Sequence, residues 1–414
     1  MFDLAAKLDR PGLAWIISCQ AQSIGYAFFV GSYLFAGNTI QRVFFYTAIM
    51  VPFLLYIGHK TLHSVFRSPL FLISILLMVY LWLTVLWSTP GGLALFVFES
   101  RRIWMLGAFI AMTAFLAARC PDFLRTVPLV LAVLGALSAI AALVMSYGIE
   151  GNPFPRARLR SYGRGSNPLD ATPVYSIIIV WVVVWLSEER AIAPRLKWLA
   201  TICLAPMLGF LVMAQGRAAL LAIALSLVLL LLLRRTDYVR HAAIVGGILA
   251  LVFIGLLMGP LDQIIERGLS YRPQVWRVGL DYALQKPWFG HGLLNKPNLA
   301  VERFVFQHPH NVLIVVLLQG GIIALGAFLW VLVAYARVAW RQFRRDGSAL
   351  LLVLMMCGFT NAIVDFYSVL TSVDRVWFAI WLPVGLAIAY ELRSADTASE
   401  IAVGQRPAAM QAKP

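Results

Sequence analysis

Long apolar runs, separated by short polar segments, repeat along almost the whole chain. A helix that crosses a bilayer needs roughly 20 apolar residues. On this criterion the pattern predicts an all-α integral membrane protein with about twelve spanning helices. The predicted spans lie at about 12–36, 41–58, 69–88, 102–118, 124–148, 172–187, 195–214, 216–234, 240–259, 310–338, 347–367 and 373–391.

The same pattern divides the chain into four parts. Residues 1–259 carry the first nine predicted spans, interrupted by an Arg-rich loop at 149–171. Residues 260–309 are too polar for a membrane and form one large loop that contains an amphipathic helix. Residues 310–391 hold the last three spans, and the polar tail 392–414 is predicted to be disordered.

Composition agrees with this picture, since hydrophobic residues make up 61% of the chain and charged residues only 13%. The net charge of +15 then favours anionic lipids as partners over nucleic acid. The four cysteines are scattered without CxxC spacing, which indicates neither a disulfide framework nor a zinc site. The sequence has no paired-carboxylate metal motif on its outer face and no phosphate-binding loop for ATP, so we expect no cofactor.

Basic residues set the predicted orientation. If both termini are cytoplasmic, every inner loop carries at least two Lys or Arg, as the positive-inside rule requires. The outer, periplasmic side then still holds many arginines, gathered at Arg101–Arg102, in the loop 149–171 and in the large loop. Arginine grips phosphate through two parallel hydrogen bonds. We therefore expect this face to handle a phosphate-bearing lipid, with anchoring at head groups as the alternative.

His310 is the candidate general base. It lies in HPHN at the outer mouth of the tenth span, where Pro309 suits the first turn of a helix. A helix N-terminus disfavours the charged imidazole, which leaves a neutral group able to accept a proton. Asn311 lies beside it, and His308 could share or replace the role. The alternative is an interfacial histidine that only binds a loop carbonyl.

Two arginines are the main candidates for binding an anion. Gln215 and Gly216 predict a tight hairpin that places Arg217 in the first turn of the next helix, where free N–H groups also attract anions. Arg272 precedes Pro273 at the start of an amphipathic helix in the large loop. Arg277 lies on the same helix, and Arg272 is preferred to face the site. The alternative partners for these two are the acidic residues Glu266, Asp262 and Asp281.

Further candidates are weaker. The loop 149–171 reads as a flexible flap in which alternating arginines would share one side if extended, with Arg160 and Arg164 as second-tier phosphate ligands. Arg102 belongs to the outer arginine group. Asp365, near the end of a span, is either functional or part of a buried pair that pins the last two spans.

In combination, several of these motifs resemble the shared core of the O-antigen ligase and polymerase superfamily, which includes protein O-oligosaccharyltransferases. The matching features are the turn before Arg217, Arg272 with Trp276, Gly290 with Gly292, and His310 with Asn311, within roughly residues 210–325. The resemblance implies a GT-C-like inner-membrane enzyme with a periplasmic site. It also implies an undecaprenyl-diphosphate-linked glycan donor and no need for metal or ATP.

Within that superfamily the ligases fit best, because the chain has one large outer loop and about 400 residues; the polymerases are the runner-up. The expected reaction is an inverting glycosyl transfer to lipid A–core oligosaccharide, with His310 as base and Arg217 and Arg272 on the diphosphate. The alternatives from other classes are a lipid-linked glycan flippase or exporter and a non-catalytic scaffold.

Overall fold

The computed structural model describes residues 18–153, 158–163, 167, 169–189, 192–234 and 271–404, the last ten without their side chains. The predicted span 240–259 and Arg164 therefore lie outside the described residues.

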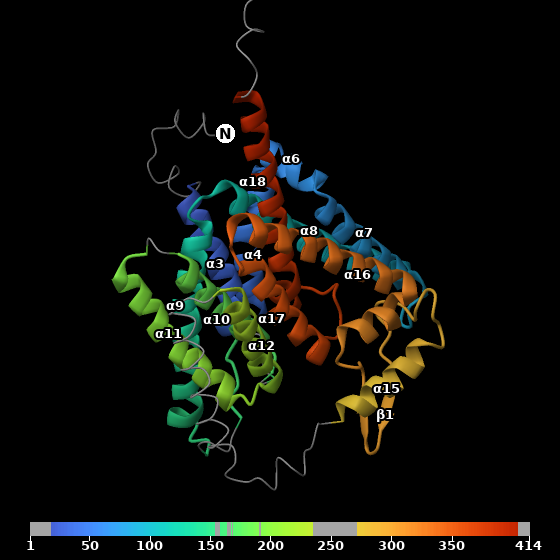
Figure 1. The fold of residues 1–414 in the computed structure, drawn as a ribbon. Coiled ribbons are helices and arrows are strands. Elements are labelled where there is room, and N and C mark those ends of the chain that lie inside the picture. Colours follow the sequence, from blue (N-terminus) through green and yellow to red (C-terminus); the bar gives the residue numbers. More distant parts are fainter. Residues whose placement is uncertain are drawn as a thin grey trace, which may run out of the picture.

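Within these ranges the chain is almost entirely helical (Figure 1). The helices of the first half are α3 (Cys19–Phe35), α4 (Asn38–Phe45), η1 (Tyr46–Met50), α5 (Val51–Leu55), α6 (Lys60–Arg67), α7 (Pro69–Leu83), η2 (Thr84–Trp87), α8 (Leu93–Arg119), α9 (Phe123–Leu143), η3 (Val144–Ile149), α10 (Thr172–Glu188), α11 (Pro194–Met213) and α12 (Arg217–Leu233). The second half contributes α15 (Arg272–Ala283), α16 (Val312–Asp346), α17 (Leu350–Asp365), η4 (Trp377–Trp381) and α18 (Leu382–Gly404).

The predicted membrane character is confirmed in coarse form. Among the described residues, five helices are long and apolar enough to cross a bilayer, or six if the bent pair Asn38–Leu55 and Lys60–Arg67 forms one span. Helices α10, α12 and α17 are also apolar but shorter. The total of twelve spans remains a prediction.

Three helices differ from the sequence-based expectation. Helix α8 begins at Leu93 rather than near residue 102, so Arg101 and Arg102 lie within a helix and not in a loop. The predicted inner loop after residue 58 contains α6, which is bent by 100° from the preceding helix. Helix α18 continues to Gly404, past Arg393, where the sequence predicted a disordered tail. Helix α8 gains the apolar turns that begin at Leu93, whereas α6 and the end of α18 are polar helical segments that an apolar window does not detect.

Helix α16 is broken at Gly321, whose φ of 67° is left-handed. The segment Pro287–Gly292 fits into this break. The backbone N–H groups of His291 and Gly292 donate to the carbonyls of Leu318 and Gln319 at 2.7 and 3.0 Å, and Ile322 N–H donates to the Pro287 carbonyl at 2.8 Å. The loop thus satisfies polar groups that the break exposes.

Glycine is required where this loop meets the helix. Gly290 has a φ of 69°, and a Cβ there would lie 2.6 Å from the backbone of Gln319 and Gly320. The glycines of WFGHG are therefore explained by close backbone packing. His291 helps to shape this loop, since its Nε2 lies 2.8 Å from the Tyr282 carbonyl.

The large loop is not purely helical. After α15, strands β1 (Leu299–Val301) and β2 (Phe304–Phe306) form an antiparallel hairpin in which Ala300 pairs with Val305. This hairpin corrects the all-α expectation. Val275 of α15 packs against Leu299 and Val301 in a small apolar cluster of its own, which fixes the orientation of α15 above the helix mouths.

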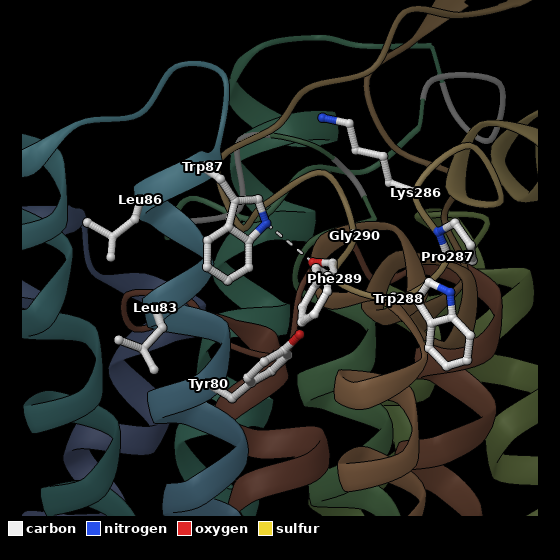
Figure 2. A pocket seen from close by; sticks show the side chains of 9 residues that line it. All are labelled: Tyr80, Leu83, Leu86, Trp87, Lys286, Pro287, Trp288, Phe289 and Gly290. Atoms are coloured by element: carbon white, nitrogen blue, oxygen red, sulfur yellow. Dashed lines mark hydrogen bonds between the residues drawn. The ribbon is translucent and has the colours of Figure 1, made fainter.

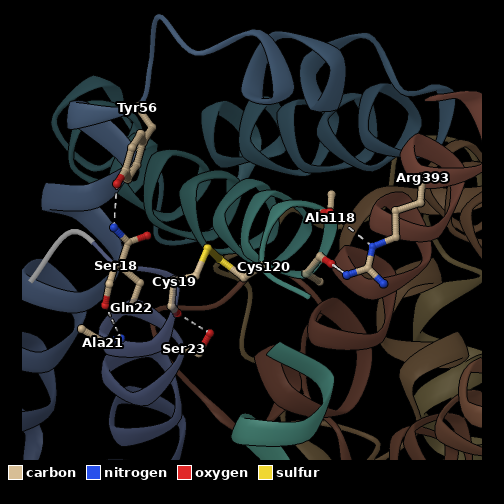
Figure 3. Close-up of a disulfide and its surroundings, with 10 residues drawn as sticks. Ser18, Cys19, Ala21, Gln22, Ser23, Tyr56, Ala118, Cys120 and Arg393 are labelled. Carbon is tan, nitrogen blue, oxygen red and sulfur yellow. Dashed lines mark hydrogen bonds between the residues drawn. A yellow bond between two sulfur atoms is a disulfide. The ribbon is translucent and has the colours of Figure 1, made fainter. Parts of the chain in front are cut away.

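A disulfide joins Cys19 at the start of α3 to Cys120 after α8 (Figure 3). This bond corrects the prediction that no disulfide was indicated. The two cysteines are 101 residues apart in sequence, so no local cysteine spacing could predict the bond. Cys203 and Cys357 are buried and unpaired.

Different elements lie at the two ends of the helix bundle. Helices α6 and α18 meet at one end, and α15 with β1 lies at the other (Figure 1). Cys19 lies at the first of these ends, since the opposite end of α3 reaches Ser161 of the arginine-rich loop, whose Oγ donates to the Leu34 carbonyl. The sequence-based orientation assigns the α15 end to the periplasm, and this orientation remains a prediction.

Candidate active site

His310 and Asp365 form a hydrogen-bonded pair at the α15 end of the bundle. His310 Nδ1 lies 3.1 Å from Asp365 Oδ1. A carboxylate at Nδ1 fixes the tautomer and leaves Nε2 as the proton-accepting nitrogen. His310 has a φ of 52°, an unusual conformation for a residue other than glycine and one that clusters at functional sites.

Asn311 explains how His310 is held. It is the N-cap of α16, and its Oδ1 accepts from the N–H groups of Leu313 and Ile314 at 3.0 and 3.3 Å. The helix begins at Val312, three residues after Pro309, so Pro309 does not occupy the first turn as predicted. The capped helix positions the preceding histidine.

Asp365 also binds Arg375 through its second carboxylate oxygen. Arg375 Nη1 lies 3.5 Å from Asp365 Oδ2, and Nη2 donates to the Asp365 carbonyl at 3.1 Å. Arg375 also pairs with Asp170, next to α10. The sequence left open whether Asp365 is functional or pins helices. The geometry supports both interpretations, because one oxygen faces Arg375 and the other faces His310.

The third neighbour of Asp365 is Arg272, the first residue of α15, with 3.8 Å between Nη2 and Oδ1. This contact replaces the salt bridge to Asp281 that the sequence offered as an alternative. Glu266 and Asp262 lie outside the described residues. Arg272, His310 and Asp365 therefore meet although they lie far apart in sequence.

A cavity of about 220 Å³ opens beside Asp365 and is lined by three arginines. They are Arg158, Arg217 and Arg272. Arg217 begins α12 after the predicted Gln215–Gly216 turn. Burial lowers the pKa of Arg272; Asp365 opposes this effect, and Arg217 adds to it. Two guanidiniums that repel across one cavity form a site that an anion would stabilise.

Exposure alternates along residues 158–161 of the arginine-rich loop, with Leu159 and Ser161 buried and Arg158 and Arg160 exposed. This matches the predicted alternation. The segment is not a free flap, since Leu159 N–H donates to the Met213 carbonyl at 3.0 Å and Ser161 is anchored to α3. Arg158, rather than the preferred Arg160, lines the cavity.

A second cavity of about 300 Å³ is lined in part by His308 and Pro309 of the HPHN segment. His308, Tyr367, Gln319 and Arg102 contribute to its wall. Burial, and then His310, lowers the pKa of His308 to about 4. The rings of the two histidines are 4.1 Å apart. A base that weak is a poor proton acceptor at neutral pH, which favours His310.

Arg102 reaches this cavity from α8. It pairs with Glu99, one turn earlier, and its Nη1 donates to the Leu370 carbonyl at 3.3 Å. These contacts hold it at the cavity wall. Arg277, by contrast, is exposed on α15 and lines neither of these two cavities.

An apolar groove of about 700 Å³ lies between α7 with η2 and the loop that fills the break in α16 (Figure 2). Leu83, Leu86 and Phe289 line it, and they are 38%, 50% and 60% exposed. Trp87 Nε1 donates to the Phe289 carbonyl at 3.3 Å across the top. Lys286 is the charged residue of the lining.

Two comparisons bear on identity. Residues 202–329 match a family model described as "O-Antigen ligase". A protein named "O-antigen ligase" from Pseudomonas aeruginosa strain PAO1 is 30% identical over 369 residues, which cover 86% of each chain. The chain belongs to the O-antigen ligase family. With its apolar helices, it is therefore a multi-pass membrane protein of lipopolysaccharide biosynthesis.

The O-antigen ligase match places the site residues in two groups. Arg217, Arg272 and His310 lie inside residues 202–329, where the sequence motifs also lie. Asp365 and Arg375 lie beyond it. The sequence offered a buried pair that pins the last two spans as one interpretation of Asp365, but Arg375 was not among the site candidates. Charged residues are rare within apolar spans, and this was the feature of the sequence that could have identified both Asp365 and Arg375.

Proposed function

We propose that this protein transfers O-antigen glycan from undecaprenyl diphosphate to lipid A–core oligosaccharide at the periplasmic face of the inner membrane. The observation that carries the proposal is Asp365, which contacts His310 while lining the cavity that holds Arg217 and Arg272. A proton acceptor thus adjoins an anion site, which is the arrangement that glycosyl transfer from a diphosphate requires.

In the proposed reaction, Nε2 of His310 takes the proton of an acceptor sugar hydroxyl. The hydroxyl oxygen attacks the anomeric carbon from the face opposite the diphosphate, so the new bond forms with inversion. The bond from the anomeric carbon to the diphosphate oxygen breaks, and undecaprenyl diphosphate leaves with the electron pair. Arg158, Arg217 and Arg272 neutralise the negative charge on that leaving group.

The acceptor would approach His310 through the second cavity. This cavity would receive core sugars, and the apolar groove would take the acyl chains of lipid A. Lys286, above the apolar wall, suits a phosphate of the lipid A head group. Two lipid substrates would then reach His310 through different cavities.

The test is transfer between purified lipids by the reconstituted protein. His310→Gln should lower turnover by about 10²- to 10⁴-fold, the usual contribution of a general base. His63→Gln, at an exposed histidine of α6 away from the proposed site, is the matched control and should keep most of the activity. Near-normal turnover of His310→Gln would exclude it as the base. Elongation of the donor glycan without transfer to lipid A–core would identify a polymerase, and flipping without a new glycosidic bond would identify an exporter.

A further inference from the structure

A second basic cavity lies at the end of the bundle away from His310. Its volume is about 890 Å³, and its walls come from α6, α16, α18 and the start of α7. Four arginines line it: Arg67, Arg341, Arg344 and Arg345. Arg67 comes from the short helix α6, whereas the other three lie in the last two turns of α16. Convergence from such distant segments distinguishes this cleft from a run of basic residues in one loop.

The charges of the cleft are poorly balanced. Among the residues that the structure describes, Glu391 is the one acidic residue of the lining, and it accepts a hydrogen bond from Ser68 Oγ at 3.1 Å. Arg345 pairs with its neighbour Asp346 at 3.8 Å. Arg67 and Arg344 are exposed and form no ion pair with the residues that the structure describes. Unpaired guanidiniums that share a cleft favour an anionic ligand.

The rest of the lining combines the serines Ser64, Ser68 and Ser394 with apolar and aromatic residues. Val338 is buried, and Pro69, Leu392 and Tyr390 complete the wall. Trp340, beside the cleft on α16, is 52% exposed, as is common for tryptophan at a membrane interface. From Gly321 to Arg345 the helix rises by roughly 36 Å at 1.5 Å per residue, close to one bilayer core of about 30 Å. The arginines therefore lie at the opposite interface from the proposed site.

We propose that this cleft binds an anionic phospholipid of the leaflet facing away from the active site, with cardiolipin as the preferred species. The two phosphates of cardiolipin match guanidiniums presented from both α6 and α16, and its acyl chains match the apolar wall. Basic clefts between membrane helices bind such head groups. A free phosphate would use the arginines but not the apolar wall.

The test is native mass spectrometry of the full chain taken from nanodiscs of phosphatidylcholine with a minor fraction of cardiolipin. The wild type should retain cardiolipin. Arg67→Gln combined with Arg344→Gln should bind it about 30-fold more weakly, since each basic group contributes about a tenfold factor or less. Arg195→Gln combined with Lys197→Gln removes the same charge at the start of α11 and should leave binding unchanged.

Three outcomes would overturn the proposal. The first is equal cardiolipin retention by the wild type and the Arg67/Arg344 variant. The second is an equal loss of binding in both double variants, which would indicate an effect of net charge. The third is displacement of cardiolipin by millimolar inorganic phosphate, which would indicate a simple anion site. Because binding is measured directly, the result does not depend on the proposed transferase activity.

Discussion

His310 Nδ1 lies 3.1 Å from Asp365 Oδ1, although the two residues are 55 positions apart. If this contact fixes the imidazole tautomer, Asp365→Asn should lower turnover by about 10²- to 10⁴-fold with little change in donor KM. The measurement is steady-state transfer by the reconstituted protein. Asp281→Asn, an exposed acid on α15, is the control. A double variant with His310→Gln should lose no more activity than His310→Gln alone, because the two residues act as a unit.

Arg272 and Arg277 lie on one helix but in different environments. Arg272→Gln should lower kcat/KM for the donor by about 10- to 100-fold, since a charged hydrogen bond contributes roughly 1.5–3 kcal/mol. The kcat/KM of Arg272→Lys should lie between those of Arg272→Gln and the wild type, because lysine keeps the charge but cannot form the two parallel hydrogen bonds of a guanidinium. Arg277→Gln should behave as wild type. Equal effects of the two Gln variants would refute a specific diphosphate contact.

The apolar groove beside Phe289 gives a prediction about the acceptor. Leu86→Trp should fill it and raise the KM for lipid A–core, because the acyl chains lose apolar contact. The same variant should use a deacylated, water-soluble core acceptor as well as wild type does. Leu72→Trp, at an exposed position near the start of α7, controls for added bulk. A deacylated acceptor that suffers equally would show that the groove does not hold acyl chains.

His308 makes stability depend on pH. Its folded pKa is about 4, below the ordinary value of 6.5, chiefly because of burial. The unfolded chain therefore binds more protons, and stability is lost as pH falls from about 6.5 towards 4. At pH 5 the loss is roughly 2 kcal/mol. His308→Gln should show a smaller drop in Tm between pH 7 and pH 5 than wild type. Parallel Tm profiles would contradict this assignment.

The bond between Cys19 and Cys120 closes a long segment of chain. Digestion without reduction should give one cross-linked peptide pair containing both cysteines. Cys19→Ser should lower the free energy of unfolding by roughly 2–4 kcal/mol, the usual effect of a long-loop disulfide. Reduced wild type is the comparison and should unfold like the variant. Alkylation of all four cysteines in unreduced, unfolded protein would disprove the bond.

Much of the helical layout follows from local sequence. The predicted span 172–187 agrees with α10 (Thr172–Glu188), and 216–234 agrees with α12 (Arg217–Leu233). Errors arose where exposed apolar residues continue a helix, as Leu93 and Val97 do at the start of α8. The hairpin at Ala300 was missed because two three-residue strands leave too short a pattern.

Only part of the candidate site could be predicted from local sequence. Arg217, Arg272 and His310 could be singled out because each is a polar residue beside a predicted helix start. Arg158 could not be preferred over Arg160, since both are exposed positions two residues apart in one loop segment. Which of the two arginines lines the cavity depends on the other parts of the chain that face this segment.

The sequence by itself determined the membrane character and the approximate helix positions, because transfer of a helix into lipid depends on the summed hydrophobicity of about 20 consecutive residues. Only the tertiary structure decided that Asp365 joins His310 to Arg375, that the loop at Gly290 fills the break at Gly321, and that Cys19 meets Cys120. Each of these contacts joins segments whose distance in space is set by helix packing, and no local pattern of residues encodes that distance.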